Sequence, residues 1–266
     1  MQPNVPAIWR RLPPDLDSRI EECIRTGCEK AEDRGVVYLF FRADDVAVPG
    51  KQFSLMMDLF STHGAPLSLA VVPAWLTRQR WQYLKGFEKK NPSGWCWHQH
   101  GWRHANHEPG GKKQEFGDAR AVSEIRQDLE RGKHRLKQLM EDRFYPVFTP
   151  PWNRCGSGTL QLLKGLGYAA VSRSRGSKPP PPQGLPDYCV NVDLHTRKEK
   201  NPAAGWENLL AELHQALATN YCGIMIHHQM MNAAAFDFLK VLLRALKKNP
   251  KLQLTHFKDL AGKKIF

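Results

Sequence analysis

The sequence predicts an α/β protein built around a parallel β/α barrel. Segments typical of buried strands alternate with segments typical of helices along most of the chain. The strand segment VVYLFF, at residues 36–41, is apolar on both faces, as expected where helices cover both sides of a parallel sheet. Polar residues follow several of the strand segments directly, and the carboxyl ends of the strands form the active-site rim in β/α barrels.

Strand segments are predicted from runs of apolar and β-branched residues. They cover residues 36–41, 67–72, 94–100, 145–148, 168–172, 189–195, 221–228 and 252–256. In the segment GWCWHQH, side chains alternate between the two faces, so His98 and His100 are expected on the same side. This face is expected to point to the interior of the barrel.

Helices are predicted after Pro13-Pro14 and at about residues 52–60, 78–89, 118–140, 159–166, 205–219 and 233–248. In the first helix, Leu16, Ile20, Ile24 and Cys28 recur every four residues, as one helix face requires. We therefore expect an N-terminal helical extension at residues 1–34 that lies as an outer layer on a main barrel domain at residues 35–266.

The composition is that of an ordinary globular protein. Among 266 residues, 41% are hydrophobic and 24% are charged, and the mean hydropathy is -0.52, which argues against disorder. No apolar run approaches the length that spans a bilayer, and the first residues lack the charged and apolar regions of a secretory leader. We therefore expect a cytoplasmic protein with no membrane partner.

The cysteines and the net charge exclude two further classes. The six cysteines have no paired spacing typical of metal sites, so we expect reduced thiols rather than disulfides or a Cys-ligated metal. The formal charge of +13 would attract a polyanion, but the basic residues are spread over most predicted helices without interleaved aromatic residues. We therefore expect no specific nucleic-acid partner, and the oligomeric state stays unknown.

One segment of low complexity, SRSRGSKPPPPQGLPD, covers residues 172–187. Its four consecutive prolines favour an extended polyproline conformation. We therefore expect a solvent-exposed loop or a partial lid here rather than a linker between domains.

Four histidines lie within the short stretch WHQHGWRHANH, at residues 97–107. His100 and His104 have the spacing H-x3-H, which places both imidazoles on the same side of one helical turn. Two histidines, one carboxylate and an open position form a hydrolytic zinc arrangement, so this pair predicts a metal site. Chance alone also produces such a pair in a chain with 11 histidines. His98 is then expected to line the pocket, whereas nothing in the sequence requires His107 at the metal.

The aspartates Asp44 and Asp45 follow the apolar strand segment at residues 36–41. Adjacent side chains at a strand end point in different directions, so one aspartate can bind a metal while the other remains free as a base. The alternative is that the pair caps the helix that follows.

His227 and His228 end the strand segment GIMIHH, and one of them can donate a proton to a leaving group. Asp193 or His195 can orient that histidine. Alternatively, His227 is a core histidine that a backbone carbonyl satisfies.

Trp152, which follows Pro150 and Pro151, can provide a rigid aromatic wall on which a sugar ring stacks. Ordinary packing is an equally good explanation of this tryptophan.

Taken together, these motifs resemble the polysaccharide deacetylase superfamily, also called the NodB homology or carbohydrate esterase 4 group. That superfamily carries, in order, a T-F-D-D-G motif, an H-[ST]-x-x-H motif, an R-P-P-Y-like motif and an L-x-H motif. The segments RADDV, HGWRH, TPPWN and IMIHH occur in the same order here, over roughly residues 36–260. Three departures indicate a divergent branch: Val46 replaces glycine, Gly101 replaces serine or threonine, and Thr149 replaces the arginine that would hold the base. Arg42 or Arg154 can supply that missing charge.

The resemblance implies a distorted parallel (β/α) barrel of about seven strands. It also implies that Asp44 is the catalytic base and His227 the general acid, and that Asp45, His100 and His104 bind a divalent transition metal, with Zn2+ the first candidate. The residues then expected to bind the substrate or to support the ligands are Arg42, His98, Pro151, Trp152, Asn153, Arg154, Asp193 and His228.

The expected function is therefore metal-dependent hydrolysis of an amide bond, with an N-acetylated sugar or polysaccharide as the substrate. Members of the same superfamily also hydrolyse non-sugar amides and cyclic ureides, which is one alternative. A carbohydrate-binding protein that has lost turnover is another. Two histidines and a carboxylate also suit Fe(II), so a non-haem iron oxygenase is a further rival.

Overall fold

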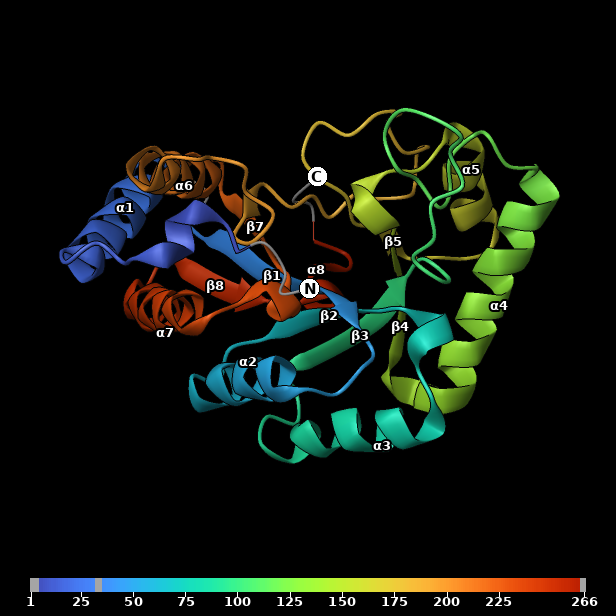
Figure 1. Ribbon diagram of the computed structural model, residues 1–266, viewed down its shortest axis with the longest axis horizontal. Helices are drawn as coiled ribbons and strands as arrows, with labels where there is room; N and C mark the ends of the chain where they lie inside the picture. Colours follow the sequence, from blue (N-terminus) through green and yellow to red (C-terminus); the bar gives the residue numbers. More distant parts are fainter. Residues whose placement is uncertain (1–4, 32–34, 264–266) are drawn as a thin grey trace.

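A computed structural model describes residues 5–31 and 35–263 of the chain. Its centre is a parallel sheet in the order β5-β4-β3-β2-β1-β7-β6, with β8 paired to β1 (Figure 1). The strands are β1 (Val37–Val46), β2 (Leu67–Val71), β3 (Trp95–His100), β4 (Phe144–Thr149), β5 (Ala170–Val171), β6 (Val192–Asp193), β7 (Tyr221–Ile226) and β8 (Leu252–Thr255). The sheet curls with helices around it, so the predicted distorted parallel barrel is confirmed.

Strand β1 is the centre of the sheet because it pairs with three neighbours. It pairs with β7 along one edge, and on the other edge with β8 at its amino end and with β2 at its carboxyl end. Burial of a strand on both faces requires apolar side chains, and β1 meets this requirement with Leu39, Phe40 and Phe41, which are fully buried. The strand therefore places its carboxyl end, with Asp44 and Asp45, at the middle of the rim.

The distortion of the barrel arises where β5 and β6 are short. The chain just before β6 forms hydrogen bonds to both ends of the sheet. The Val190 N–H donates to the carbonyl of Arg173, which follows β5, and the Asn191 N–H donates to the Gly223 carbonyl of β7. Irregular chain thus links the two ends of the sheet where a regular barrel has full strands.

The helices cover the outside of the sheet. They are α1 (Leu16–Lys30), α2 (Lys51–Thr62), α3 (Arg78–Lys85), α4 (Val122–Met140), α5 (Ser157–Gly165), α6 (Pro202–Ala218), α7 (Ala233–Lys248) and α8 (Phe257–Leu260). Two predicted helices differ most in their bounds. The one expected at 118–140 begins at Val122, and the one expected at 78–89 ends at Lys85 and continues as the 3-10 helix η3 (Gly86–Lys89).

The N-terminal segment packs closely on the barrel. Helix α1 lies against α6 and α7 and buries Ile20, Ile24 and Cys28 in the shared core. Before it, the 3-10 helix η1 (Ala7–Arg10) buries Trp9, whose indole N–H donates to the Leu194 carbonyl. The expected boundary between an extension and the main domain falls after residue 34, and residues 32–34 lie outside the described residues.

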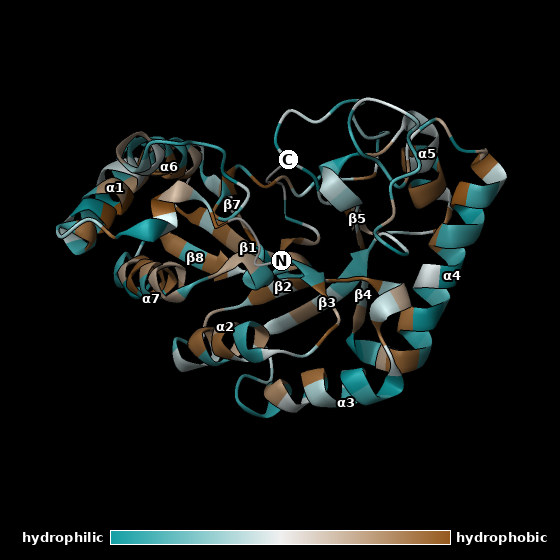
Figure 2. Cartoon of the chain, in the orientation of Figure 1, coloured by the Kyte–Doolittle hydropathy of each residue, from teal (hydrophilic) through white to brown (hydrophobic). Residues whose placement is uncertain are grey.

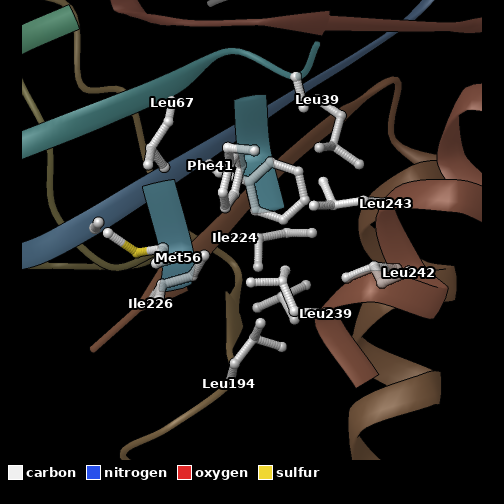
Figure 3. Packing of buried hydrophobic residues seen from close by; sticks show 14 of the residues in the cluster. Leu39, Phe41, Met56, Leu67, Leu194, Ile224, Ile226, Leu239, Leu242 and Leu243 are labelled. Carbon is white, nitrogen blue, oxygen red and sulfur yellow. The ribbon is translucent and has the colours of Figure 1, made fainter. Parts of the chain in front are cut away.

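The largest core fills the space between the sheet and helices α1, α2, α6 and α7. Figure 3 shows Leu39 and Phe41 of β1 and Ile224 of β7 beside Leu239 and Leu243 of α7. Burial of each such side chain contributes about 1.5–3 kcal/mol relative to exposure to water. In Figure 2, much of β1 is hydrophobic, whereas α4 carries both hydrophilic and hydrophobic residues, as expected of a helix with one face on the sheet.

All six cysteines are free thiols, and five of them are buried. Among the helices within residues 5–31 and 35–263, none has both the length and the apolar character needed to cross a bilayer.

Candidate functional site

The two aspartates are separated by a bulge at the end of β1. The register between β1 and β2 shifts between Ala43 and Val46, where β1 has one residue more than β2. Asp45 there has a φ of 58°, in the left-handed region. The aspartates do not cap helix α2, because the residue at its N-cap is Gly50. As a result, Asp44 pairs with the arginine on its own strand, while Asp45 faces two histidines of another segment.

Asp45, His100 and His104 converge on one point. Asp45 Oδ1 lies 3.2 Å from His100 Nε2 and 3.3 Å from His104 Nε2. One potential ligand atom from each residue lies within 4.8 Å of the other two. The structure therefore brings together the three residues expected to bind a metal.

The hydrogen bonds around these three residues fit a bound cation. His100 Nδ1 lies 2.9 Å from the Thr149 carbonyl oxygen, which can only accept, so Nδ1 carries a proton. The Nε2 of a neutral His100 then presents a lone pair toward Asp45 Oδ1, a buried oxygen without a hydrogen-bond partner. A divalent metal would resolve this meeting of electron-rich atoms, and two imidazoles with one carboxylate are ligands typical of zinc.

The pKa values of the aspartate and the first histidine are coupled. Burial alone would raise the pKa of Asp45, but the nearby imidazoles of His100 and His104 outweigh it and lower that pKa. Burial likewise would lower the pKa of His100, and Asp45 and Asp44 outweigh it and raise that pKa. The carboxylate is therefore ionised, as metal binding requires.

The segment that carries His104 is not a helical turn, so this part of the prediction is wrong. Gly101 and His104 both lie in the left-handed region, with φ of 57° and 59°. The buried carboxylate of Glu115 holds the segment by accepting hydrogen bonds from the backbone N–H groups of Trp102, Arg103 and His104, at 3.1, 2.6 and 3.2 Å. The imidazoles meet because Glu115 folds the loop back.

The same loop requires glycine at position 101. A Cβ atom on Gly101 would lie 2.2 Å from Glu115 Oε2 and 2.6 Å from Pro151 Cγ, far inside normal contact. The absence of a serine or threonine after His100 therefore has a steric reason in this chain.

Asp44 is held by Arg42, two residues earlier on the same strand. Arg42 Nε donates to Asp44 Oδ1 and Arg42 Nη2 to Asp44 Oδ2, both at 2.8 Å. Arg42 also donates to Ser172 Oγ at 2.8 Å and to Asn153 Oδ1 at 2.6 Å. The other candidate, Arg154, instead donates to the Lys113 carbonyl.

Arg42 determines the charge state of Asp44. Burial would raise the pKa of Asp44, but the charges of Arg42, His100 and His227 outweigh it, and the pKa is lowered. Asp44 is therefore an ionised carboxylate beside the three converging residues and is not one of them.

His98 is fully buried on β3 and contacts Thr149 at the end of the neighbouring strand β4. Its Nε2 lies 2.9 Å from Thr149 Oγ1, and its ring packs against Phe257 with centroids 4.8 Å apart. Burial lowers the pKa of His98 to about 3, so its imidazole is neutral. Thr149 thus contacts both His98 and His100.

His227 and His228 differ in their surroundings. His228 is 2% exposed and packs edge-on against Phe53, whereas His227 is half-buried and its charge acts on both Asp44 and Asp45. Of the two residues expected to orient this pair, His195 accepts a hydrogen bond from the His227 backbone N–H. The Asp193 carboxylate instead accepts from the backbone N–H groups of His195 and Thr196 within its own turn.

Trp152 and Asn153 lie on the 3-10 helix η5 (Pro151–Asn153), after β4. The Trp152 ring stands 4.5 Å from the His104 ring, centroid to centroid. Both residues have left-handed φ values, 55° and 60°. Of the six non-glycine residues with positive φ in the described chain, four lie in this site: Asp45, His104, Trp152 and Asn153. Such strain is typical of functional sites.

Three residues at this site were not predicted from the sequence. Ser172 follows β5 at the rim, so its position was a usable signal. Gln229 donates to the Asp45 carbonyl at 2.7 Å, and no pattern in the sequence indicated this contact. Glu115 binds the loop backbone but lies in a loop without periodicity, so no signal in the sequence indicated it either.

No family model matches the sequence, and no curated protein matches it either. Solved structures do match. A candidate polysaccharide deacetylase from Mycobacterium smegmatis aligns with a TM-score of 0.65 at 12% identity, over 87% of this chain and 91% of that one. A family 4 acetyl xylan esterase from Clostridium thermocellum, solved with a cobalt ion, aligns with a TM-score of 0.54 at 10% identity, over 84% and 89%.

A third match is a CE4 family pseudoenzyme from Bacillus anthracis, with a TM-score of 0.53 at 10% identity, over 82% of this chain and 63% of that one. All three identities are low, as expected of a divergent branch. The chain therefore has the fold of the polysaccharide deacetylases and family 4 carbohydrate esterases.

Proposed function

We propose that the protein is a metal-dependent hydrolase of amide bonds that removes the acetyl group from an N-acetylated sugar or polysaccharide. The observation that carries this proposal is the placement of Asp44 beside Asp45, His100 and His104. The three converging side chains would hold the metal, and Asp44 is kept free and ionised by Arg42. A bound divalent metal would polarise the amide carbonyl and increase the acidity of a water molecule.

The chain's own residues then have separate roles. Asp44, ionised and held by two hydrogen bonds from Arg42, takes the proton of the attacking water. His227 donates a proton to the departing amine nitrogen. His195 positions His227 through the backbone N–H of that residue.

The substrate assignment is supported by the shape of the rim. The partly exposed Trp152 ring beside His104 offers a face on which a sugar ring can stack. Among the matching structures, one is an acetyl xylan esterase and another is a deacetylase with its substrate, which supports an acetylated substrate for this chain. A zinc ion is the first candidate because of the ligand set.

A catalytically inactive carbohydrate-binding protein is the second candidate, since one matching structure is a pseudoenzyme. The presence here of a complete Asp-His-His set and of a separate carboxylate favours turnover. A hydrolase of non-sugar amides or ureides would use the same groups and differ in the pocket. An iron oxygenase has no evident use for Asp44.

The test is a screen for hydrolysis with protein reconstituted separately with Zn2+, Co2+ and Fe2+. Release of acetate from N-acetylated mono- and oligosaccharides supports the proposal. Hydrolysis of ureides alone supports the non-sugar alternative, and oxygen consumption with Fe2+ supports the oxygenase. Saturable sugar binding without acetate release, by protein with stoichiometric metal, supports the inactive binding protein.

A further inference from the structure

A cavity of about 420 Å³ adjoins the candidate active site. Two segments line it: the loop after β3, with Lys112, and the Pro-rich segment 172–187, with Arg175 and Lys178. Asn153 and Arg154, after β4, also line the cavity, and the remaining lining residues are Gln114, Gly176 and Ser177. Its volume lies within the range of pockets that bind small ligands.

The cavity is continuous with the catalytic groups through Asn153. This residue lines the cavity, and its Oδ1 accepts a hydrogen bond of 2.6 Å from Arg42 Nη2. The same Arg42 atom also donates to Asp44 Oδ2 at 2.8 Å. A molecule in the cavity is thus separated from the proposed base by two side chains in direct contact.

The lining of the cavity is strongly basic. Lys and Arg make up 39 of the 266 residues of the chain, yet they are four of the eight residues that line this cavity, and none of the eight is acidic. Within residues 5–31 and 35–263, none of Lys112, Arg154, Arg175 and Lys178 forms an ion pair with an acidic side chain. Their charges are therefore available to a ligand.

The nearby Arg173 shows that the lack of an ion pair is not general in this segment. Arg173, two residues before Arg175, is 1% exposed and forms an ion pair with Asp187 at 2.7 Å. This pair closes the base of the Pro-rich segment, since Arg173 Nη1 also donates to the Pro179 carbonyl at 2.8 Å. The segment is thereby fixed as a wall that presents Arg175 and Lys178 to the cavity.

We infer that this cavity binds an anionic group, a phosphate or a carboxylate, carried by the acylated sugar substrate. The inference rests on the proposed amide hydrolysis at Asp44, which it deepens by naming the charge of the substrate. Two guanidinium and two ammonium groups match the several oxygens of such an anion. Lys113, 6.0 Å from the Trp152 ring centroid, extends the same charge along the rim.

The test compares the affinities of metal-loaded protein for N-acetylglucosamine, its 1-phosphate and 6-phosphate, and N-acetylmuramic acid, by calorimetry at low salt. We expect at least one anionic sugar to bind about tenfold or more tightly than the neutral sugar, with affinity falling as salt rises. A phosphorylated sugar that binds best assigns a phosphate, and N-acetylmuramic acid that binds best assigns a carboxylate. Equal affinity for neutral and anionic sugars overturns the inference.

A triple variant, Lys112→Gln, Arg175→Gln and Lys178→Gln, is expected to lose this preference. The matched control is Lys30→Gln, Lys89→Gln and Lys240→Gln, which removes the same number of charges from exposed positions on α1, η3 and α7. The control is expected to retain the preference. Equal loss in both variants, or tighter binding of an RNA oligonucleotide than of any anionic sugar, shows a general positive field and overturns the inference.

A further variant separates this site from the metal. Asp45→Asn, prepared without metal, is expected to keep its preference for the anionic sugar, and loss of the preference there would place the anion on the metal instead. The two proposals also fail separately. Preferential binding of an anionic sugar without any acetate release would contradict the proposed hydrolase and support the anion site. Rapid acetate release from neutral sugars alone would support the hydrolase and contradict the anion site.

Discussion

Arg42 holds Asp44 through two parallel hydrogen bonds of 2.8 Å, although both side chains belong to one strand. This geometry is possible because alternate residues of a strand share a face. Arg42 is fully buried, and Ser172 and Asn153 fix its guanidinium from two other strand ends. The proposed base is therefore positioned by β1, β4 and β5 together.

Replacement of Arg42 is expected to impair both folding and catalysis. In Arg42→Met, Asp44 remains buried without a partner, so the free energy of unfolding should fall by about 3–5 kcal/mol. The pKa of Asp44 should rise, so the acid limb of the profile of kcat/KM against pH should move to higher pH. Arg42→Lys keeps the positive charge but cannot donate the two parallel hydrogen bonds. Its free energy of unfolding and its acid limb should therefore lie between those of the wild type and of Arg42→Met. The control Arg131→Met, on the exposed face of α4, should change neither the free energy of unfolding nor the acid limb. An acid limb that does not move in Arg42→Met would argue against Asp44 as the base.

Metal content distinguishes the histidines of the stretch at residues 97–107. Asp45→Asn, His100→Ala and His104→Ala should each lower zinc affinity by on the order of 100-fold, because each removes one of three converging ligand atoms. His107→Ala is the matched control, since His107 is exposed and lies beyond the loop that Glu115 holds. Mass spectrometry of the bound metal after dialysis measures this. The metal site would be wrong if all four variants kept stoichiometric zinc.

Two glycines in the left-handed region separate backbone strain from steric clash. Gly101 has a φ of 57° and has no space for a Cβ, whereas Gly111 has a φ of 76° and no atom within 4 Å of the point that a Cβ would occupy. Gly111→Ala should cost only the left-handed penalty, about 1–2 kcal/mol. Gly101→Ala should cost more and should also weaken metal binding, because Glu115 and Pro151 must move. Chemical unfolding gives both values, and equal losses would mean that the loop adapts freely.

Stability is expected to fall in acid because of buried neutral histidines. Burial lowers the pKa of His228 from its ordinary 6.5 to about 4, and it lowers the pKa of His195 as well. Below pH 6.5 the unfolded chain takes up protons that the folded chain does not accept until about pH 4. The free energy of unfolding should therefore decrease through this window, by up to about 1.4 kcal/mol per pH unit for each such histidine.

The variant His228→Gln should reduce this slope between pH 6.5 and 4, as measured by urea unfolding. His134→Gln, on the exposed face of α4, serves as the control and should keep the wild-type slope. A slope that is unchanged in His228→Gln would show that this histidine is protonated in the folded protein.

The fold was predictable because it depends on patterns that are local in sequence. Alternation of strands and helices indicated the parallel architecture, and doubly apolar strands such as β1 indicated burial on both faces. The irregular closure between β5 and β7 was not predictable, because Val190 and Asn191 bond to segments distant in sequence.

The candidate site was only partly predictable for a similar reason. Strand ends placed Asp45 and His100 at one rim, but the approach of His104 depends on Glu115, which binds three backbone N–H groups without any recurring pattern. The choice of Arg42 over Arg154 also needed the structure, because only strand geometry brings a guanidinium onto Asp44.

The most direct test of the account is acetate release by Asp44→Asn that carries stoichiometric metal. The substitution keeps the shape of the side chain and leaves Asp45, His100 and His104 intact, so metal content should equal that of the wild type. Because a general base contributes on the order of 10²–10⁴ in rate, kcat should fall by that factor while the KM changes little. Acetate release at the wild-type rate by the metal-loaded Asp44→Asn protein would contradict the account.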